Sequence, residues 1–269
     1  MENRKAFLGE FLGTFMMVFF GTGVVALAVC FGEFASTWEI GAVWGIAVMV
    51  SIYATRHLSA AHFNPSVTFA MAVTKRLPWK RVPVYLAAQF IAAFCAGLMV
   101  YAVFHGAIAD YEAANGIVRG TPESMASAKM FGEYYQIGDN DWVTMPVAML
   151  AEAAGTFILV LMIFCMTEKA NEGRPSADIW PVFVGLTLSI CIGLFGPVSQ
   201  AGFNAARDFA PRIVSLLFGW GSAAWPDGAG GFFWVYMLAP TVGGILAGLV
   251  FTKVFEKTML PEPAAEELK

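Results

Sequence analysis

Six long apolar runs constrain this chain more than any other feature. They cover residues 7–31, 40–54, 82–104, 145–166, 179–198 and 232–254. A helix rises about 1.5 Å per residue, so about 20 residues cross the ~30 Å hydrocarbon layer of a bilayer. The second run is short, and we expect a tilt or polar ends to extend it to about residue 59. Only 13% of the 269 residues are charged, against about 25% in a soluble domain, so we predict an all-α membrane protein with six transmembrane helices.

The charged residues predict how the spans are oriented. If successive spans alternate in direction, basic residues at 4–5, 75–81, 169–174 and 253–257 flank one side and the acidic loop 106–141 lies on the other. Positive residues stay on the cytoplasmic side, so we expect both termini in the cytoplasm. The first run exceeds the roughly 7–15 residues of a signal-peptide core, so we expect it to be retained. We expect the acidic residues 258–269 to be a disordered tail.

Residue types that serve catalysis or metal binding are scattered along the chain. The four cysteines lie within or beside apolar runs and lack disulfide or metal spacing, which is typical of small buried hydrophobes. No cluster of His, Cys or acidic residues has the spacing of metal ligands or of a nucleophile and its base. We therefore expect no enzyme activity, cofactor, metal or nucleic-acid partner.

The second half of the chain weakly repeats the first. Residues 10–15 (EFLGTF) lie in the first run and residues 152–157 (EAAGTF) in the fourth. HFNPS (62–66) lies between the second and third runs, and GFNAARD (202–208) lies between the fifth and sixth. Three spans per repeat is an odd number, so the second copy enters the membrane from the opposite side. We expect one repeat over 1–110, an extracellular linker loop over 111–142 and an inverted repeat over 143–257.

An apolar segment too short to cross the bilayer follows each of these Asn motifs. The segments cover residues 65–73 and 205–217, and nine helical residues reach only about 14 Å. Asn64 suits the N-cap of the first segment, and Pro65 suits its first helical position. Inversion would bring Asn64 and Asn204 together near the midplane, where two helix N-termini form a positive centre. The alternative is that both asparagines are ordinary N-caps in surface loops. That alternative does not explain why they occupy matched positions in the two repeats.

These paired motifs resemble those of the aquaporin, or major intrinsic protein, family. The residues similar to its two Asn-Pro-Ala motifs are Asn64, Pro65 and Ser66 in the first copy and Asn204, Ala205 and Ala206 in the second. The following Arg207 and Asp208, the long 106–141 loop and the Gly-Trp-Gly at 219–221 are similar to the glycerol-facilitator branch. The resemblance runs from about residue 6 to 257.

The resemblance implies an aquaporin-like fold of six spans and two re-entrant half-helices, assembled as a homotetramer with one pore in each protomer. It further implies passive passage of glycerol and similar small uncharged polyols, together with some water, while ions and protons are excluded. We expect a multi-pass protein of the bacterial inner membrane. A secondary transporter is the rival hypothesis, which would require ion-coupling sites and accumulation of solute against a gradient.

A selectivity filter of four residues, on the extracellular side of the two asparagines, is also implied. Trp44 and Arg207 match two filter positions directly, and Ala201 falls at the third. Counting back without a gap puts Ile192 at the fourth position, whereas a shift of one residue puts Gly193 there. Trp44, Ile192 and Ala201 would form an apolar wall for CH groups, and Arg207 would supply fixed donors for hydroxyls.

The sequence departs from the family pattern in its motifs and its filter. Ser66 replaces the usual Ala, Ala205 replaces the second Pro, and Ala201 replaces the aromatic residue of bacterial glycerol channels. Because Ala is a strong helix former, we expect the second half-helix to form without the proline. A Trp/Ile/Ala/Arg filter is similar to that of the plant nodulin-type branch, so a water-, urea- or metalloid-acid-selective channel is the alternative.

Two carboxylates, Glu10 and Glu152, lie within predicted spans. Ionisable residues at membrane depth are functional by default, so proton-coupled transport is one hypothesis for them. The resemblance instead implies a structural role, in which each carboxylate accepts backbone N–H groups from a re-entrant loop. His62 and Asp208 are expected to support the same loops.

Overall fold

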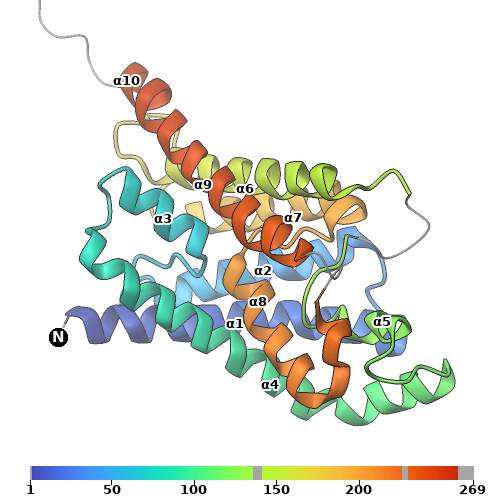
Figure 1. The fold of residues 1–269 in the computed structure, drawn as a ribbon. Coiled ribbons are helices and arrows are strands. Elements are labelled where there is room, and N and C mark those ends of the chain that lie inside the picture. Colours follow the sequence, from blue (N-terminus) through green and yellow to red (C-terminus); the bar gives the residue numbers. More distant parts are fainter. Residues whose placement is uncertain (1, 136–140, 226–229, 260–269) are drawn as a thin grey trace, which may run out of the picture.

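The computed structural model describes residues 2–135, 141–225 and 230–259, and within them it consists of helices and connecting loops (Figure 1). Six helices are long and apolar enough to cross a membrane. They are α1 (Glu2–Phe31), α2 (Thr37–Thr55), α4 (Val82–Ala114, after a 3-10 turn at Trp79–Arg81), α6 (Met145–Thr167), α7 (Trp180–Ser199) and a composite span over Phe233–Met259. The prediction of an all-α protein with six spans is confirmed.

The sixth span changes helical pitch along its length. A π-helical segment, η5 (Phe233–Leu238), leads into α9 (Ala239–Val250), and a second, η6 (Phe251–Phe255), leads into α10 (Glu256–Met259). The disordered tail was expected to begin at residue 258, but α10 includes residues 258 and 259. The rest of that tail, 260–269, lies outside the described residues.

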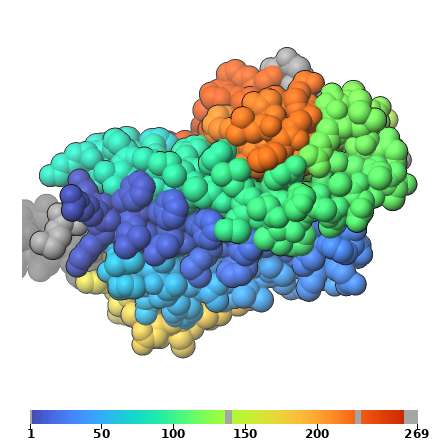
Figure 2. Space-filling model, turned by 90° about the horizontal axis from the view of Figure 1, so that it is seen from below, coloured from blue at the N-terminus to red at the C-terminus, as the bar shows by residue number. Residues whose placement is uncertain are grey.

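The spans form two groups of three that meet between α2 and α7. Helix α1 packs against α4 and α2, and α6 packs against α9 and α7; Figure 2 shows α1 and α4 side by side on one face. Gly45 and Gly185 face each other where α2 contacts α7, since a Cβ added to either residue would lie 2.4 Å from the other's carbonyl oxygen. Residues without a side chain therefore permit this close helix contact.

Large apolar side chains cover the outward sides of the spans. Leu150 on α6 is 70% exposed, and Leu194 on α7 is 61% exposed. Every span carries at least one further residue of this kind. Extended apolar surface is unfavourable in water but suits a lipid environment. The exposed surface therefore agrees with an integral, multi-pass membrane protein.

Two short helices, α3 (Pro65–Val73) and α8 (Ala205–Ser215), start inside the molecule. Helix α3 packs against α9, and α8 packs against α4 (Figure 1). Each short helix therefore packs against the last span of the opposite half. Helix α8 forms without proline at its first position, as expected, and a π-helical segment over Leu216–Trp220 continues it.

Two further predicted boundaries are wrong. Helix α4 runs to Ala114, so the loop expected from residue 106 begins at 115. Its last turn is held by Glu112, which accepts hydrogen bonds from Arg119 Nε and from Ser127 Oγ, the latter at 2.7 Å. Helix α2 ends at Thr55 instead of extending to about residue 59, because the following residues turn back into the loop that precedes α3.

Candidate functional site

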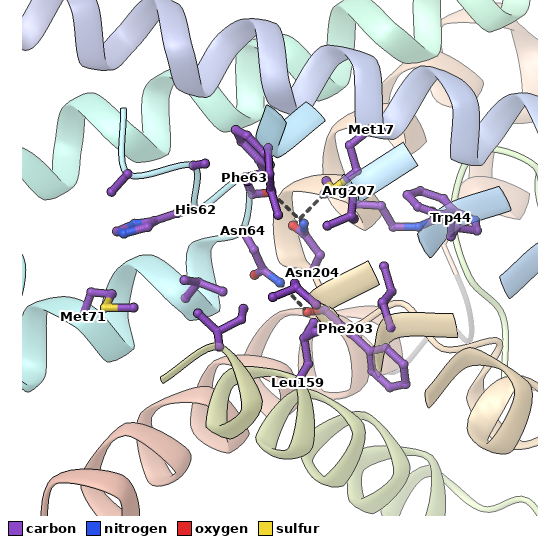
Figure 3. A pocket seen from close by; sticks show the side chains of 18 of the residues that line it. Met17, Trp44, His62, Phe63, Asn64, Met71, Leu159, Phe203, Asn204 and Arg207 are labelled. Atoms are coloured by element: carbon purple, nitrogen blue, oxygen red, sulfur yellow. Dashed lines mark hydrogen bonds between the residues drawn. The ribbon is translucent and has the colours of Figure 1, made fainter. Parts of the chain in front are cut away.

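Asn64 and Asn204 lie side by side near the centre of the molecule, one at the start of each short helix (Figure 3). Asn64 Nδ2 donates a hydrogen bond to the carbonyl oxygen of Phe203 at 2.8 Å. Asn204 Nδ2 donates to the carbonyl oxygen of Phe63, also at 2.8 Å. The two loops therefore hold each other through reciprocal bonds. Both asparagines also line a central cavity of about 260 Å³.

The same two asparagines cap the helices that follow them. Asn64 Oδ1 accepts a hydrogen bond from the backbone N–H of Ser66 at 2.8 Å. Asn204 Oδ1 accepts from the N–H groups of Ala206 at 3.0 Å and Arg207 at 3.1 Å. These are the ordinary N-cap bonds that satisfy the first free N–H groups of a helix. The positive ends of both helix dipoles are thus directed at the asparagines.

The other motif residues shape the helix starts and do not line this cavity. Pro65 and Ala205 occupy the first helical positions, and Ala206 is fully buried. Ser66 is also fully buried, and its Oγ has no hydrogen-bond partner among the described residues. Its Cβ would lie 3.1 Å from a Cβ added to Gly244, so Ser66 faces helix α9.

Glu10 on α1 is buried behind the first re-entrant loop and accepts four hydrogen bonds. Two come from the backbone N–H groups of His62 at 2.9 Å and Phe63 at 2.8 Å. The others come from Ser59 Oγ at 2.8 Å and Gln89 Nε2 at 2.9 Å. A buried carboxylate is costly unless its oxygens are hydrogen-bonded, and these four contacts satisfy that need. They also connect Glu10 on α1 to the backbone of the first re-entrant loop.

Glu152 on α6 occupies the matching position behind the second loop. It accepts hydrogen bonds from the backbone N–H groups of Gly202 at 2.8 Å and Phe203 at 2.6 Å, and from Ser199 Oγ at 2.6 Å. The ring of Phe203 also packs over Gly155, where an added Cβ would lie 2.2 Å from a ring carbon. Both intramembrane carboxylates therefore have the same kind of partners.

The two re-entrant loops adopt left-handed backbone conformations at matching positions. The φ angles are 53° at Ala61 and 51° at Phe63 in the first loop, and 61° at Ala201 and 51° at Phe203 in the second. Non-glycine residues in this region cost about 1–3 kcal/mol each and cluster at functional sites. The hydrogen bonds to the two buried glutamates offset this cost.

His62 and Asp208 have partners within the protein. His62 Nδ1 lies 3.1 Å from Thr68 Oγ1, and its ring packs against Tyr85. Asp208 Oδ2 accepts a hydrogen bond from Arg212 Nε at 2.7 Å. Among residues 2–135, 141–225 and 230–259, no three His, Cys, Asp or Glu side chains come together as a metal site.

Three residues separate the central cavity from a second cavity of about 320 Å³, because they line both. They are Trp44, Ile192 and Ala201. Lys129 and Glu133 line the second cavity but not the central one. Gly193 lines neither, and a Cβ added to it would face Trp38. The structure therefore places Ile192, rather than Gly193, at the constriction between the two cavities.

Arg207 completes this constriction and is only 2% exposed. Its Cζ lies 4.7 Å from the ring centroid of Trp44 (Figure 3). Its Nη2 forms an ion pair with a carboxylate oxygen of Glu133. Within the described part of the chain, Nη1 has no hydrogen-bond partner, whereas Nη2 is held by its ion pair with Glu133. A buried donor such as Nη1 is costly when unpaired, so the constriction offers a strong donor to a ligand.

A family model described as "Major intrinsic protein" matches residues 1–251. The chain belongs to the major intrinsic protein family. The resemblance read from the paired motifs is confirmed by this match.

Named relatives of this major intrinsic protein cover most of its length. The glycerol uptake facilitator protein of Haemophilus influenzae is 36% identical over 91% of this chain and 92% of the relative. The protein of the same name in Escherichia coli is 34% identical, covering 92% and 86%. The propanediol uptake facilitator PduF of Salmonella typhimurium is 32% identical, covering 96% and 97%.

A solved structure has the same fold. The aquaglyceroporin from Plasmodium falciparum matches with a TM-score of 0.81 and 27% sequence identity, covering 96% of this chain and 98% of that one. The likeness therefore extends over nearly the whole of this major intrinsic protein.

Sequence reasoning missed two residues of the site, Glu133 and Arg212. Arg212 is fully buried and bonded to Asp208, a pairing that the i,i+4 spacing on α8 can reveal. Glu133 lies 74 positions before Arg207 in a loop, and no local pattern connects the two. In the sequence, Glu133 contributes only to the acidic charge of the 106–141 loop. This major intrinsic protein therefore has a carboxylate at its constriction that the motif alone does not predict.

Proposed function

We propose that this chain is a passive channel for glycerol and similar small uncharged polyols, and for some water. The observation that carries the proposal is the constriction, where apolar surface from Trp44, Ile192 and Ala201 lies beside Arg207, whose Nη1 is a buried donor without a hydrogen-bond partner among the described residues. As a member of the major intrinsic protein family, the chain is a channel rather than an enzyme. We assign Trp44, Ile192, Ala201 and Arg207 as its selectivity filter.

A constriction with two kinds of surface suits a polyol. Removing a hydroxyl from water without a new partner costs about 2–7 kcal/mol, so a wholly apolar pore rejects glycerol. Arg207 supplies donors for the hydroxyls, while Trp44 and Ile192 contact the CH groups. Further inside, the Asn64 and Asn204 amides, with carbonyl groups of the re-entrant loops, continue the polar path. Each contact must stay modest, because conduction requires exit as well as entry.

The same features oppose the passage of ions. Arg207 carries a permanent positive charge at the narrow point. The N-termini of α3 and α8 add partial positive charge at Asn64 and Asn204. Glu133 offsets part of the charge of Arg207, so a cation meets its further electrostatic barrier at the two helix N-termini. We propose that Glu10, Glu152, His62 and Asp208 support the loops and do not couple solute movement to protons.

The named relatives support the choice of solute. Two of those reported are glycerol uptake facilitators and one is a propanediol uptake facilitator. Both solutes are small, uncharged polyols, which fits a constriction with adjacent apolar and donor surfaces. The large apolar side chains on the outer surface are exposed and therefore available for contacts with lipid or with further copies of the chain.

We further propose that the protein is a homotetramer of a bacterial inner membrane with both termini in the cytoplasm. The basic residues at 75–81 and 253–257 support this orientation. The proposed organisation is two inverted repeats, 1–110 and 143–257, joined by an extracellular linker at 111–142, whose residues 111–114 continue helix α4.

Reconstituted protein tests the function directly. Vesicles are exposed to an inward glycerol gradient, and their reswelling is followed by stopped-flow light scattering. We expect glycerol to enter faster than in protein-free vesicles and to stop at equal concentrations inside and outside. Entry at the rate of empty vesicles would refute the channel. Accumulation driven by a proton or sodium gradient would instead identify a secondary transporter.

A further inference from the structure

Glu133 lies where the second cavity meets the constriction. It is 5% exposed, lines that cavity and forms an ion pair with Arg207 Nη2. Arg207 lines the central cavity, on the other side of Trp44, Ile192 and Ala201. The constriction therefore contains a carboxylate in contact with the guanidinium, so a strong acceptor lies directly beside strong donors.

The backbone of Glu133 is fixed independently of its side chain. Its N–H donates to Asp208 Oδ1 at 2.8 Å, and its carbonyl oxygen accepts a hydrogen bond from Arg212 Nη2. The next residue is held as well, because the Tyr134 N–H donates to Gln200 Oε1 at 2.7 Å. These backbone bonds hold the loop at Glu133 without using its carboxylate, which contacts Arg207 instead.

We propose that Glu133 is a fifth specificity-determining residue of this channel, which accepts a hydrogen bond from the solute while Arg207 donates one to it. The proposal rests on the proposed function. A solute whose two hydroxyls are on neighbouring carbon atoms can donate to Glu133 and accept from Arg207 at the same time. A solute whose hydroxyls are one carbon further apart reaches both groups less well. The channel therefore favours vicinal diols over isomeric 1,3-diols.

The test compares 1,2-propanediol with 1,3-propanediol, which have the same mass and composition. Their permeabilities are measured by light scattering in one batch of vesicles, so their ratio does not depend on the amount of folded protein. We expect Glu133→Ala to lower the ratio of 1,2- to 1,3-propanediol permeability by about three- to tenfold, as expected for one lost hydrogen bond. Glu133→Gln keeps an acceptor oxygen and should lower the ratio less.

Glu123→Gln is the matched control, because Glu123 is an exposed carboxylate in the same extracellular segment. It should leave the ratio unchanged. If Glu133→Ala slows both diols in parallel, Glu133 only positions Arg207 and the specificity proposal is overturned. An unchanged ratio with unchanged rates overturns it as well. Absence of diol and glycerol flux in the wild-type protein would overturn the proposed function, and this proposal with it.

Discussion

At the scale of single residues, the small side chain of Ala201 has the clearest consequence for solute size. It lines both cavities beside Trp44 and Ile192, so a larger side chain there narrows the constriction itself. We predict that Ala201→Phe slows four- and five-carbon polyols more than glycerol in the vesicle assay. Ala102→Phe, at an exposed position on α4, is the control and should slow neither the larger polyols nor glycerol. Equal slowing of all polyols would mean that Ala201 does not set the width of the path.

Glu133 also predicts a dependence on pH. Burial raises the pKa of Glu133 to about 7, while Arg207, Arg212 and Lys129 act to lower it and Asp208 acts to raise it. The carboxyl group is therefore protonated below about pH 7 and ionised above it. Since only the ionised form pairs fully with Arg207 and accepts strongly, we expect glycerol flux to rise between pH 6 and pH 8.

The pH measurement is made with equal pH on both sides of the vesicle membrane, so that no proton gradient exists. Glu133→Gln cannot ionise at this position, and its glycerol flux should be flat over the same range. The Glu123→Gln control should keep the wild-type profile. A pH dependence that survives in Glu133→Gln would assign the titration to another group.

At the scale of elements, the sequence predicted the helices that carry local signals. The bounds of α3 agree with the predicted 65–73 because an N-cap Asn and a Pro at the first position mark its start. The start of α8 was found in the same way from Asn204. The end of α4 was missed, because its last ten residues are no longer uniformly apolar but remain helix-forming. Its final turn depends on the contacts of Glu112 with Arg119 and Ser127, which no local pattern shows.

The site was predictable to the extent that it repeats. Asn64 and Asn204, like Glu10 and Glu152, were found because each has a counterpart in the other half. Glu133 has no such counterpart, and its contact with Arg207 arises only when the loop folds over α8. Pairings between distant segments of this kind have no periodicity in the sequence, so the structure was needed to find them.

The buried carboxylate of Glu152 predicts how the second re-entrant loop is stabilised. The N–H groups of Gly202 and Phe203 donate to different oxygens of Glu152, so the NH₂ group that replaces one oxygen in Glu152→Gln faces one of these N–H groups. Leaving a buried donor unpaired costs about 1–3 kcal/mol, and we expect the apparent melting temperature in detergent to fall by about 2–12 °C. Glu123→Gln should not change it. An unchanged melting temperature in Glu152→Gln would mean that the loop does not depend on this carboxylate.

At the scale of the whole molecule, the arrangement of α3 and α8 explains why the two asparagines meet. Helix α3 packs on α9 and α8 packs on α4, so each half of the chain holds the short helix of the other half. The reciprocal bonds of Asn64 to Phe203 and of Asn204 to Phe63 lie at the contact. A substitution that breaks one of these bonds therefore disturbs the polar path, because both halves of the chain contribute to it.

The central claim is that one path runs from the second cavity, past Arg207 and Trp44, to the paired asparagines. An experimental structure of the protein in a lipid environment with glycerol tests it most directly. We predict glycerol between Trp44 and Arg207, with its hydroxyls toward the guanidinium, and Asn64 and Asn204 each bonded to the opposite loop. Asparagines held apart, or glycerol bound only outside this path, would contradict the account.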